Sequence, residues 1–384
     1  MSGAFDVDRV ISDAAPSEAD VAAQAELDKV FGALNLVESE DEAQQRVRAI
    51  KLLNGIVIEW AKEVSLSLGL SEAAAAECRP RLFSFGSYRL GVHTPGADID
   101  MLVVGPRHLT REHAFDSLYK KLKLHQDVSE LTAVPDAHVP IMKFMLAGVD
   151  FDLLYAALLV DALPENLAVT ELEILRGLDM KTVRSLNGAR VAEEMLRAVP
   201  NRDTFRRALR LIKYWAKQRG IYGNAYGYPG GVAWALMVAR ACRFFPKANP
   251  AQLVRRLFFL YTHWKWPQPV CVKVSEKHPD IGLDDEVFDS ESYMGQRALM
   301  PVLTPAYPCM NSTYNVNTSS LRHLTLEWKR AHEVLNSVKV PNGDTWRQLL
   351  RPASFFADHT HFLELSTWFA PEEGETLDEE DGLA

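Results

Sequence analysis

The segment FGSYRLGVHTPGADID, residues 85–100, carries the strongest local signal in the chain and ends in two aspartates, Asp98 and Asp100. Side chains alternate between the two faces of a β-strand, so these carboxylates are predicted to point the same way, whereas Ile99 and Met101 face a core. Carboxylates about 6.5 Å apart along a strand can share two divalent metal ions lying about 3.5–4 Å from each other. The spacing therefore predicts a strand that carries two metal ligands.

Upstream of the aspartates, Gly86 and Ser87 provide a residue without a side chain and a hydroxyl, where a backbone can approach a phosphate closely. Neither signal is specific on its own. Two aspartates separated by one residue also occur in sugar-nucleotide transferases, on calcium-binding loops and as solvated surface acid, and Gly-Ser is common in ordinary turns. The function therefore depends on what the rest of the chain adds.

Short apolar runs around this segment predict a β-sheet. The runs are residues 81–85, 98–104, 128–134, 140–146 and 149–158. A helix is expected at about 110–123, and another at about 42–64 begins with a capping box formed by Ser39 and Glu42. Helices followed by such a sheet indicate an α/β or α+β catalytic domain that ends near residue 200.

A further acidic pattern lies in the last of these runs, VDFDLLYAAL, where Asp150 and Asp152 alternate with apolar residues. A charge in so hydrophobic a run favours a partner or a metal ion, because burying an unpaired charge is costly. An edge strand with one solvated face is the alternative. The pattern does not distinguish Asp150 from Asp152 as a third metal ligand.

The second half of the chain is predicted to be helical. Helices are expected at 202–219, after the GYPGG segment at 227–231, from the N-cap pair Asn249 and Pro250, and at 319–338. We therefore expect a catalytic domain over residues 1–200 and a helical domain over 201–351. A strand-like run at 354–365 is interpreted as the start of a third domain, and residues 371–384 have the composition of a disordered acidic tail.

The net charge of −9 is concentrated at the two ends of the chain. Residues 1–50 carry 11 acids and 4 bases, and residues 371–384 carry 7 acids, so residues 51–370 hold 38 bases against 33 acids. This mildly basic body is compatible with nucleic-acid binding without proving it. The four cysteines form no CxxC pair, which is typical of thiols in a reducing compartment and argues against a zinc site. The sequence shows neither a membrane-spanning run nor a secretory signal.

Longer stretches of the chain resemble the nuclear poly(A) polymerase family, within the polymerase-β-like nucleotidyltransferase superfamily. The matching pieces are FGSYRLGVHTPGADIDMLVV, PRHLTREHAF, VPIMKFMLAGVDFDLL, RSLNGARVAEEML, RALRLIKYWAKQRGIYGNAYGYPGGVAWALMVARAC, WKWPQPV and MPVLTPAYPCMNSTYNV. They span over half the chain. The glycine and aspartate signature alone is shared with uridylyltransferases and antibiotic-modifying enzymes, whereas the long matches in the helical half are specific to this family.

The resemblance implies an α+β fold in which a polymerase-β-like nucleotidyltransferase domain faces a helical central domain, with the active site between them. It implies template-independent addition of AMP from ATP to RNA 3′ ends, as in mRNA polyadenylation. The RNA 3′-hydroxyl would attack the ATP α-phosphorus in line and release pyrophosphate, with two Mg²⁺ or Mn²⁺ ions bound by Asp98, Asp100 and Asp152. Asp152 is preferred to Asp150 because the family's third carboxylate directly precedes the apolar run.

The resemblance also implies which residues contact the nucleotide. The ATP-binding set is Phe85, Gly86, Ser87, Thr94, Lys213, Tyr222, Asn224, Gly231 and Val232, and Asn187 would contact base or RNA. Ser87 would meet the phosphates and Lys213 would neutralise the triphosphate. Each residue type has a structural alternative. Lys213 shares its helix with basic residues that are mostly solvated, Tyr222 can pack in the core, and Asn187 and Asn224 can be turn or capping residues. The glycines that open the next helix can form an ordinary loop-to-helix junction.

The chain departs from the family after Pro352. The family's third, RNA-recognition-like domain should extend for well over a hundred residues there, but 32 residues follow Pro352. We therefore expect that domain to be largely missing, with only its start at 352–370 before the acidic tail.

The resemblance also implies partners and location. The expected partners are ATP, an RNA 3′ end and a pre-mRNA 3′-end processing complex, for a monomer in the nucleus with no membrane association. A uridylyltransferase of the same superfamily and a catalytically inactive RNA-binding paralogue are the alternatives. The intact set of three aspartates argues against the paralogue, because a scaffold has no need to gather buried charge.

Overall fold

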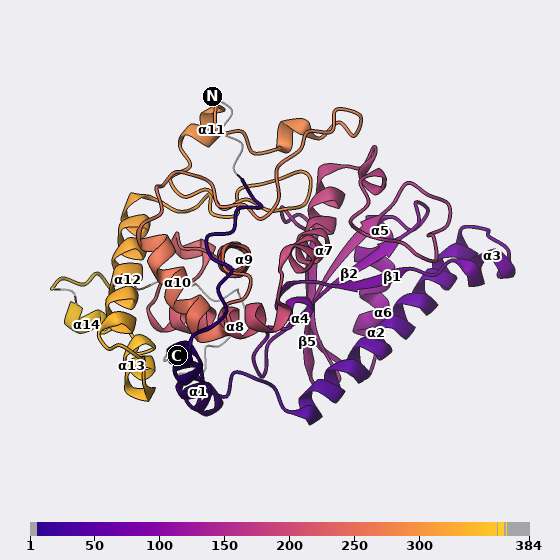
Figure 1. Ribbon diagram of the computed structural model, residues 1–384. Coiled ribbons are helices and arrows are strands. Elements are labelled where there is room, and N and C mark those ends of the chain that lie inside the picture. The colour runs from indigo at the N-terminus through magenta and orange to yellow at the C-terminus, as the bar shows by residue number, and fades with distance from the viewer. Residues whose placement is uncertain (1–5, 359, 365, 367–384) are drawn as a thin grey trace. The chain divides into compact units, whose positions relative to one another are not determined.

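The computed structural model describes residues 6–358, 360–364 and 366. The chain divides into two compact units, residues 1–351 and residues 352–384. The first unit contains a β-sheet with a hydrophobic core on each face, and a set of helices with a core of their own (Figure 1). The expected α+β fold is confirmed. The acidic tail expected at 371–384 lies outside the described residues.

The sheet has five strands. They are β1 (Arg81–Ser84), β2 (Ile99–Gly105), β3 (Val128–Val134), β4 (Ile141–Leu146) and β5 (Val149–Ala157), close to the five runs expected from the sequence. Their spatial order is β1-β2-β5-β4-β3. The pair β2 and β5 runs parallel, and the other neighbouring strands are antiparallel. Because β2 and β5 are parallel, their first residues lie side by side at the same end of the sheet.

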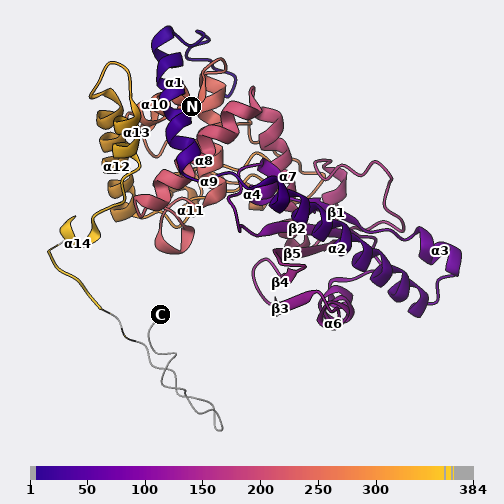
Figure 2. The ribbon, with the colours of Figure 1, turned by 90° about the horizontal axis from the view of Figure 1, so that it is seen from below.

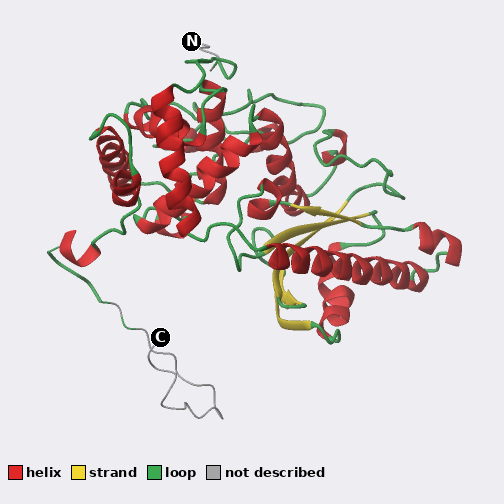
Figure 3. Cartoon of the chain, turned by 60° about the horizontal axis from the view of Figure 1, so that its bottom comes forward, coloured by secondary structure: helices red, strands yellow, loops and turns green. Residues whose placement is uncertain are grey.

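Helices cover both faces of the sheet (Figure 3). On one face, α2 (Glu40–Ser67) packs on Ile99 and Met101, which are buried as the strand pattern predicted. On the other face, α7 (Met180–Ala198) packs on Leu102 and its neighbours. The shorter elements of this part are α3 (Glu72–Glu77), α4 (Gly86–Leu90), α5 (Arg111–His113), the π-helical turn η1 (Ala114–Leu118), α6 (Tyr119–Lys123) and the 3₁₀ turn η2 (Glu173–Leu175). The helix expected at 110–123 corresponds to α5, η1 and α6.

The long helix α2 begins with the capping box that the sequence predicted. The Ser39 backbone N–H donates to Glu42 Oε2 at 2.8 Å, and the Glu42 backbone N–H donates to Ser39 Oγ at 3.3 Å. Two of the amides that have no partner within the helix are thereby satisfied. This fixes where α2 starts and which of its faces turns toward the sheet.

The second half of the first unit is built from helices around α9. Its elements are α8 (Arg202–Gln218), η3 (Asn224–Tyr226), α9 (Gly231–Phe244), α10 (Pro250–Thr262), η4 (Asp284–Glu286), α11 (Tyr293–Gln296), α12 (Thr318–Asn336) and α13 (Gly343–Leu349). Helix α9 is buried along most of its length and mostly apolar, with Arg240 and Arg243 as its charged residues, as expected for a helix surrounded by others. Trp215 packs against Trp234 and Phe258, with ring centroids 5.9 and 4.7 Å apart. None of the helices in the described part of the chain combines the length and hydropathy of a membrane-spanning segment.

The start of α10 confirms another prediction from the sequence. Asn249 is the N-cap residue, and its Oδ1 accepts from the Gln252 backbone N–H at 2.8 Å. Pro250 occupies the first helical turn, where its missing N–H costs nothing.

The N-terminal segment packs on the helical part, although it precedes the sheet in the chain. Helix α1 (Glu18–Ala33) contributes Leu27 and its neighbours to the helical core and contacts α10 and α13 (Figure 2). Arg240 of α9 donates to the Val7 carbonyl at 2.6 Å. The chain then crosses to α2 on the sheet, so the helical part holds both ends of the first unit.

Helix α7 belongs to both cores. Val183 and Leu186 in its first half pack with the sheet, whereas Met195 and Leu196 in its second half pack with the helical part. One continuous helix therefore connects the two parts of the first unit.

The prediction of a strand at residues 354–365 is wrong. In the second unit, residues Phe355–Asp358 form the short helix α14, and the described residues of this run include no strand. The Ala357 backbone N–H donates to the Ser354 carbonyl at 2.8 Å. A strand needs a neighbour to satisfy its backbone groups, whereas this turn satisfies its own.

A buried ion pair joins α8 to α12, and it generates a stability prediction. Arg219 donates to both carboxylate oxygens of Glu327 at 2.8 and 2.9 Å, and both side chains are about nine-tenths buried. Glu327→Ala should lower the free energy of unfolding by about 3–5 kcal/mol, because it leaves the Arg219 guanidinium buried without its partner. Urea unfolding followed by circular dichroism measures the change. Glu333→Ala on the same helix is the matched control, since the Glu333 side chain is 63% exposed and should change stability by less than about 0.5 kcal/mol. Equal effects of the two substitutions would contradict the prediction.

Candidate active site

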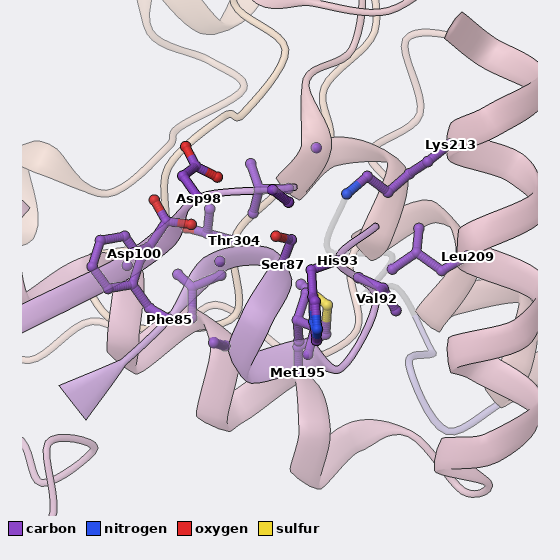
Figure 4. Close-up of a pocket in the computed structure, with 18 of the residues that line it drawn as sticks. Phe85, Ser87, Val92, His93, Asp98, Asp100, Met195, Leu209, Lys213 and Thr304 are labelled. Atoms are coloured by element: carbon purple, nitrogen blue, oxygen red, sulfur yellow. The ribbon is translucent and has the colours of Figure 1, made fainter. Parts of the chain in front are cut away.

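A cleft of about 550 Å³ lies between the sheet and the helical part of the first unit (Figure 4). Most of the residues that the sequence singled out line it. These are Phe85, Gly86, Ser87, Thr94, Asp98, Asp100, Asn187, Lys213, Tyr222, Gly231 and Val232. Asp152 and Asn224 lie beside the cleft rather than in its lining. Residues separated by almost 150 positions in the chain thus face one cavity.

The three aspartates are brought together by the parallel pairing of two strands. Asp100 of β2 stands opposite Asp152 of β5 in the register, and Asp98 immediately precedes β2. Asp150 lies two residues earlier on β5, opposite Met145 of β4, and is exposed. The register thus places Asp152, rather than Asp150, next to Asp100.

The Gly86 backbone lies against the Asp100 carboxylate. Gly86 has φ of +57°, in the left-handed region, and a Cβ at this position would overlap the Asp100 carboxylate. The Phe85 backbone N–H donates to the Asp100 carbonyl at 3.0 Å, which holds the loop to β2. A glycine is therefore required here for two reasons, its backbone conformation and the close approach.

Burial changes the protonation of Asp100, and neighbouring negative charge adds to the effect. Burial, followed by the charges of Asp98 and Asp152, raises the pKa of the Asp100 carboxyl to about 7. The nearby lysines Lys143 and Lys213 act in the opposite direction but do not cancel the effect. A carboxyl pKa raised by burial and by like charges marks a site whose positive charge does not offset its carboxylates.

Lys143 supplies part of that positive charge. It stands opposite Asp152 in the β4–β5 register, and its Nζ lies 3.0 Å from Asp152 Oδ1 and 2.7 Å from Oδ2. With Asp152 bound in this way, no three carboxylate, imidazole or thiolate groups converge on one point as a metal site would require, within the residues that the structure describes. The aspartates are adjacent, but the carboxylate of Asp152 is engaged by a lysine.

The helical side of the cleft carries two lysines and a tyrosine. Lys213 extends from α8 into the cleft, across from Ser87 and the aspartates (Figure 4). Its burial, and next the charge of Lys217, lower the pKa of its ammonium to about 8. The Lys217 Nζ lies 5.4 Å from the centroid of the Tyr222 ring, within the range of a cation–π contact. This wall presents positive charge and one aromatic face to the cavity.

The residues at the start of α9 pack against Tyr222 and Asn224. A Cβ at Gly231 would come within 2.9 Å of the Tyr222 hydroxyl, and one at Gly230 would come within 3.3 Å of Asn224 Nδ2. The glycines therefore leave the room that these two side chains occupy. Asn224 lies in η3 and its backbone carbonyl accepts from Asn315 Nδ2 at 3.0 Å.

Two asparagine oxygens near the cleft are buried without a partner. They are Oδ1 of Asn187 and Oδ1 of Asn224, neither of which accepts a hydrogen bond from any part of the chain that the structure describes. Asn187 lies inside α7, not in a turn or at a helix cap. Buried polar atoms are nearly always paired in folded proteins, so both are available to a ligand or water.

Several residues of the cleft were missed in the sequence. The polar and flexible ones are Lys217, His93, Thr304 and Met310, and the apolar ones are Leu90, Val92, Val191, Ala192, Met195 and Leu209. Lys143, which contacts Asp152 beside the cleft, was also missed. Lys217 follows Lys213 by one helical turn, which is a signal that could have identified it. Figure 4 places Val92, His93, Met195 and Leu209 at the end of the cleft away from the aspartates. His93 Nε2 lies 2.6 Å from Glu38 Oε1, a contact between residues 55 positions apart that no local pattern indicates.

This arrangement defines a class of protein. A sheet that carries adjacent carboxylates on two parallel strands, facing lysines across a cleft, is the architecture of a nucleotidyltransferase. The family model described as poly(A) polymerase nucleotidyltransferase domain matches residues 7–199, and the model described as poly(A) polymerase central domain matches residues 204–352. The chain belongs to the poly(A) polymerase family, which confirms the resemblance identified in the sequence.

Curated relatives agree with this assignment. The chain is 44% identical over 363 residues to nuclear poly(A) polymerase 1 of Arabidopsis thaliana, covering 94% of this chain and 50% of the relative. It is 42% identical over 365 residues to a poly(A) polymerase of Dictyostelium discoideum, covering 94% of this chain and 44% of the relative. The chain thus spans about half the length of the curated relatives it matches.

Solved structures share the fold at low sequence identity. The Cid1 poly(U) polymerase aligns with a TM-score of 0.56 at 14% identity, covering 88% of this chain and 99% of that chain. A cytoplasmic RNA terminal U-transferase aligns with a TM-score of 0.57 at 15% identity, covering 86% and 98%. The TM-scores establish a common fold. Sequence identity this low does not indicate which nucleotide the protein uses.

The raised pKa of Asp100 predicts how the metal-free protein responds to pH. A carboxyl whose pKa is raised from 3.8 to about 7 by folding destabilises the folded state as pH rises, because the unfolded chain releases the proton more readily. Asp100→Asn keeps the shape without the charge. In the presence of a chelator, it should be more stable than the wild type at pH 8, by up to about 4 kcal/mol.

The difference in the free energy of unfolding between Asp100→Asn and the wild type should grow from about pH 4 to about pH 7 and stay constant at higher pH. Urea unfolding at a series of pH values measures it. Asp150→Asn is the control, because Asp150 is exposed on the same sheet and should change stability by less than about 0.5 kcal/mol. A wild type at least as stable as Asp100→Asn at pH 8 would show that folding does not raise the pKa of the Asp100 carboxyl.

Proposed function

We propose that the protein is a template-independent polynucleotide adenylyltransferase, which transfers AMP from ATP to the 3′ end of RNA. The observation that carries this proposal is the 44% identity to a nuclear poly(A) polymerase over 94% of the chain, together with a cleft that retains the acidic, basic and aromatic groups such a transfer needs. The proposed ligands of the divalent ions are Asp98, Asp100 and Asp152. The proposed nucleotide contacts are the residues that line the cleft opposite them, with Asn224 beside it.

The donor set fits the divalent ions that this superfamily generally depends on. Carboxylate oxygens are hard ligands of the kind that Mg²⁺ and Mn²⁺ prefer. The raised pKa of Asp100, caused by burial and by Asp98 and Asp152, indicates carboxylates close enough to interact strongly. Release of Asp152 by Lys143 would complete the set. When two such ions are bound, they activate a hydroxyl as nucleophile and neutralise charge on the phosphate oxygens. We propose Mg²⁺ or Mn²⁺ as the ions.

The remaining residues of the cleft bind and orient the substrates. Ser87, held beside Asp100 by the Gly86 turn, offers a hydroxyl to the phosphates. Lys213 and Lys217 face the aspartates and offset the negative charge of a triphosphate. Together they hold the α-phosphorus in front of the aspartates, so that the RNA 3′-hydroxyl can attack opposite the pyrophosphate leaving group.

The base is proposed to stack on Tyr222. Stacking on an aromatic ring is worth about 1–3 kcal/mol and tolerates any base. Selection of adenine therefore requires polar contacts, and the unpartnered Oδ1 atoms of Asn187 and Asn224 are available acceptors for the adenine amino group. Uracil lacks this exocyclic amino group and offers only its ring N3–H as a donor, at a different position on its edge.

We further propose that an RNA 3′ end is the acceptor and that the protein acts in the nucleus with a pre-mRNA 3′-end processing complex. Several of the relatives are named nuclear poly(A) polymerases. Structural neighbours include the Cid1 protein in complex with a UTP analogue and with the short product ApU, a nucleotide and an RNA product respectively. A monomer is sufficient for this chemistry, because one chain supplies every proposed group.

Primer extension tests the proposal. The protein is incubated with a labelled RNA primer, Mg²⁺ or Mn²⁺, and each nucleoside triphosphate separately. ATP should be used best, GTP next as another purine, and UTP and CTP least. Asp152→Ala should abolish extension, because loss of groups that only support metal ligands already costs about 10–100-fold. Asp150→Ala is the matched control and should retain substantial activity.

Two outcomes of this experiment would change the assignment. Efficient incorporation of UTP by the wild type would indicate a uridylyltransferase, the alternative that the shared fold permits. An inactive Asp150→Ala protein beside an active Asp152→Ala protein would make the choice of the third carboxylate wrong.

The lowered pKa of Lys213 predicts the pH dependence of ATP use. Below about pH 8 its ammonium is charged and attracts the triphosphate, whereas above that pH the free enzyme increasingly carries a neutral amine. Because kcat/KM reports the free enzyme, kcat/KM for ATP should fall above about pH 8. Lys213→Arg should lack this fall, since a guanidinium stays charged. Lys217→Arg is the control and should still show the fall in kcat/KM. If Lys217→Arg lacks the fall and Lys213→Arg keeps it, the titrating group is Lys217.

A further inference from the structure

A lysine contacts both carboxylate oxygens of Asp152, one of the proposed metal ligands. The Lys143 Nζ lies within hydrogen-bond distance of both carboxylate oxygens, at 3.0 and 2.7 Å. A cation placed this close to both oxygens sits between them, where an ion bound to both would also sit. Only the outward-facing lone pairs of Asp152 then remain for another ligand.

The position of Lys143 is set by the sheet. Lys143 of β4 and Asp152 of β5 are direct partners in an antiparallel register, so their side chains leave the same face of the sheet about 5 Å apart. The ammonium also interacts with the charges of Asp98 and Asp100. It therefore belongs to the electrostatics of the whole aspartate cluster, not to one surface ion pair.

The two partners differ in exposure. The Asp152 side chain is 17% exposed, whereas the Lys143 side chain is 54% exposed on a long flexible stem. The ammonium can therefore swing into solvent without disturbing the sheet, while Asp152 stays in place. An ion pair whose cation is more than half exposed is weakened by solvent, so a divalent ion can displace it.

We propose that Lys143 is the resident counter-cation of the metal site: in the free protein its ammonium holds the Asp152 carboxylate, and a divalent ion must displace it to bind. This inference rests on the proposed function, in which Asp98, Asp100 and Asp152 are the metal ligands. It makes Lys143 a positioning residue. The ammonium reduces repulsion among the three carboxylates before the ion arrives.

Binding of Mn²⁺ to the full chain, without ATP or RNA, tests the proposal. Free Mn²⁺ is measured by electron paramagnetic resonance during titration of the wild type, Lys143→Met, Asp152→Asn and the double variant Lys143→Met with Asp152→Asn. Lys143→Met keeps the stem and removes the charge, and it should bind Mn²⁺ about two- to five-fold more tightly, the range that an exposed ion pair allows. Unchanged or weaker binding by Lys143→Met would overturn the proposal.

The double variant separates displacement from a general charge effect. If Lys143 acts mainly by holding Asp152, the gain from Lys143→Met should be clearly smaller when Asp152 is already asparagine, leaving only the effect of its charge on Asp98 and Asp100. An equal gain in both backgrounds would mean that the lysine acts only through its distant charge, and the proposal would fall. Asp100→Asn tests the metal site of the proposed function separately. If this variant binds Mn²⁺ as tightly as the wild type does, the proposed metal site is refuted, which is a result distinct from either of these.

A measurement on the wild type keeps the test independent of the folding of any variant. Lysine acetylation by a limiting acylating reagent is quantified by mass spectrometry with and without Mg²⁺. Displacement should increase the labelling of Lys143. Lys121 is the internal control, because it pairs with Glu59 and Glu63 at 3.1 and 2.9 Å, outside the aspartate cluster. Labelling of Lys143 that does not rise relative to Lys121 when Mg²⁺ is added would contradict displacement.

Discussion

The parallel pairing of β2 with β5 is the constraint on which the rest of the structure depends. It sets Asp100 and Asp152 directly opposite each other at the edge of the sheet that opens into the cleft. Neighbouring strands lie about 4.7–4.9 Å apart, so two carboxylates in this register repel each other unless a cation lies nearby. The sheet is stable with this repulsion because its two hydrophobic cores, under α2 and under α7, are well filled.

The cations that offset this repulsion come from different places in the chain. Lys143 reaches the aspartates from the neighbouring strand β4. Lys213 and Lys217 reach into the same cleft from α8, and burial together with repulsion from Lys217 lowers the pKa of Lys213. The three aspartates and Lys143 thus lie on the sheet side, and Lys213 and Lys217 lie on the helical side. A triphosphate with its divalent ions, the substrate proposed above, would place charges of both signs between them.

The sequence predicts features that depend on neighbours along the chain. The capping box at Ser39, the start of α10 at Asn249 and the alternation that buries Ile99 and Met101 are all local patterns, and the structure confirms them. The same reasoning finds Asp98 and Asp100, whereas Lys213 is singled out only by the family resemblance. Their roles in catalysis stay predictions.

Features that depend on pairing between distant segments could not be predicted in this way. Periodicity along β5 leaves Asp150 and Asp152 equivalent, and only the register with β2 separates them. Lys143 has no special pattern around it, since its significance arises from its partner across β4 and β5. The run at 354–365 has the composition of a strand, but without a partner strand it forms a turn of helix instead. Likewise, no pattern in the sequence of α1 indicates that this helix packs on the helical part.

The continuity of α7 has a mechanical consequence. Its 19 residues form one uninterrupted helix, with the first half packed on the sheet and the second half on the helical core. Separating the two parts of the first unit at α7 would therefore require breaking hydrogen bonds within that helix. Asn187 lies between Leu186, which packs on the sheet, and Met195, which packs on the helical core, so its place in the cleft is tied to both parts. The cleft thus has one boundary that moves only if both cores move with it.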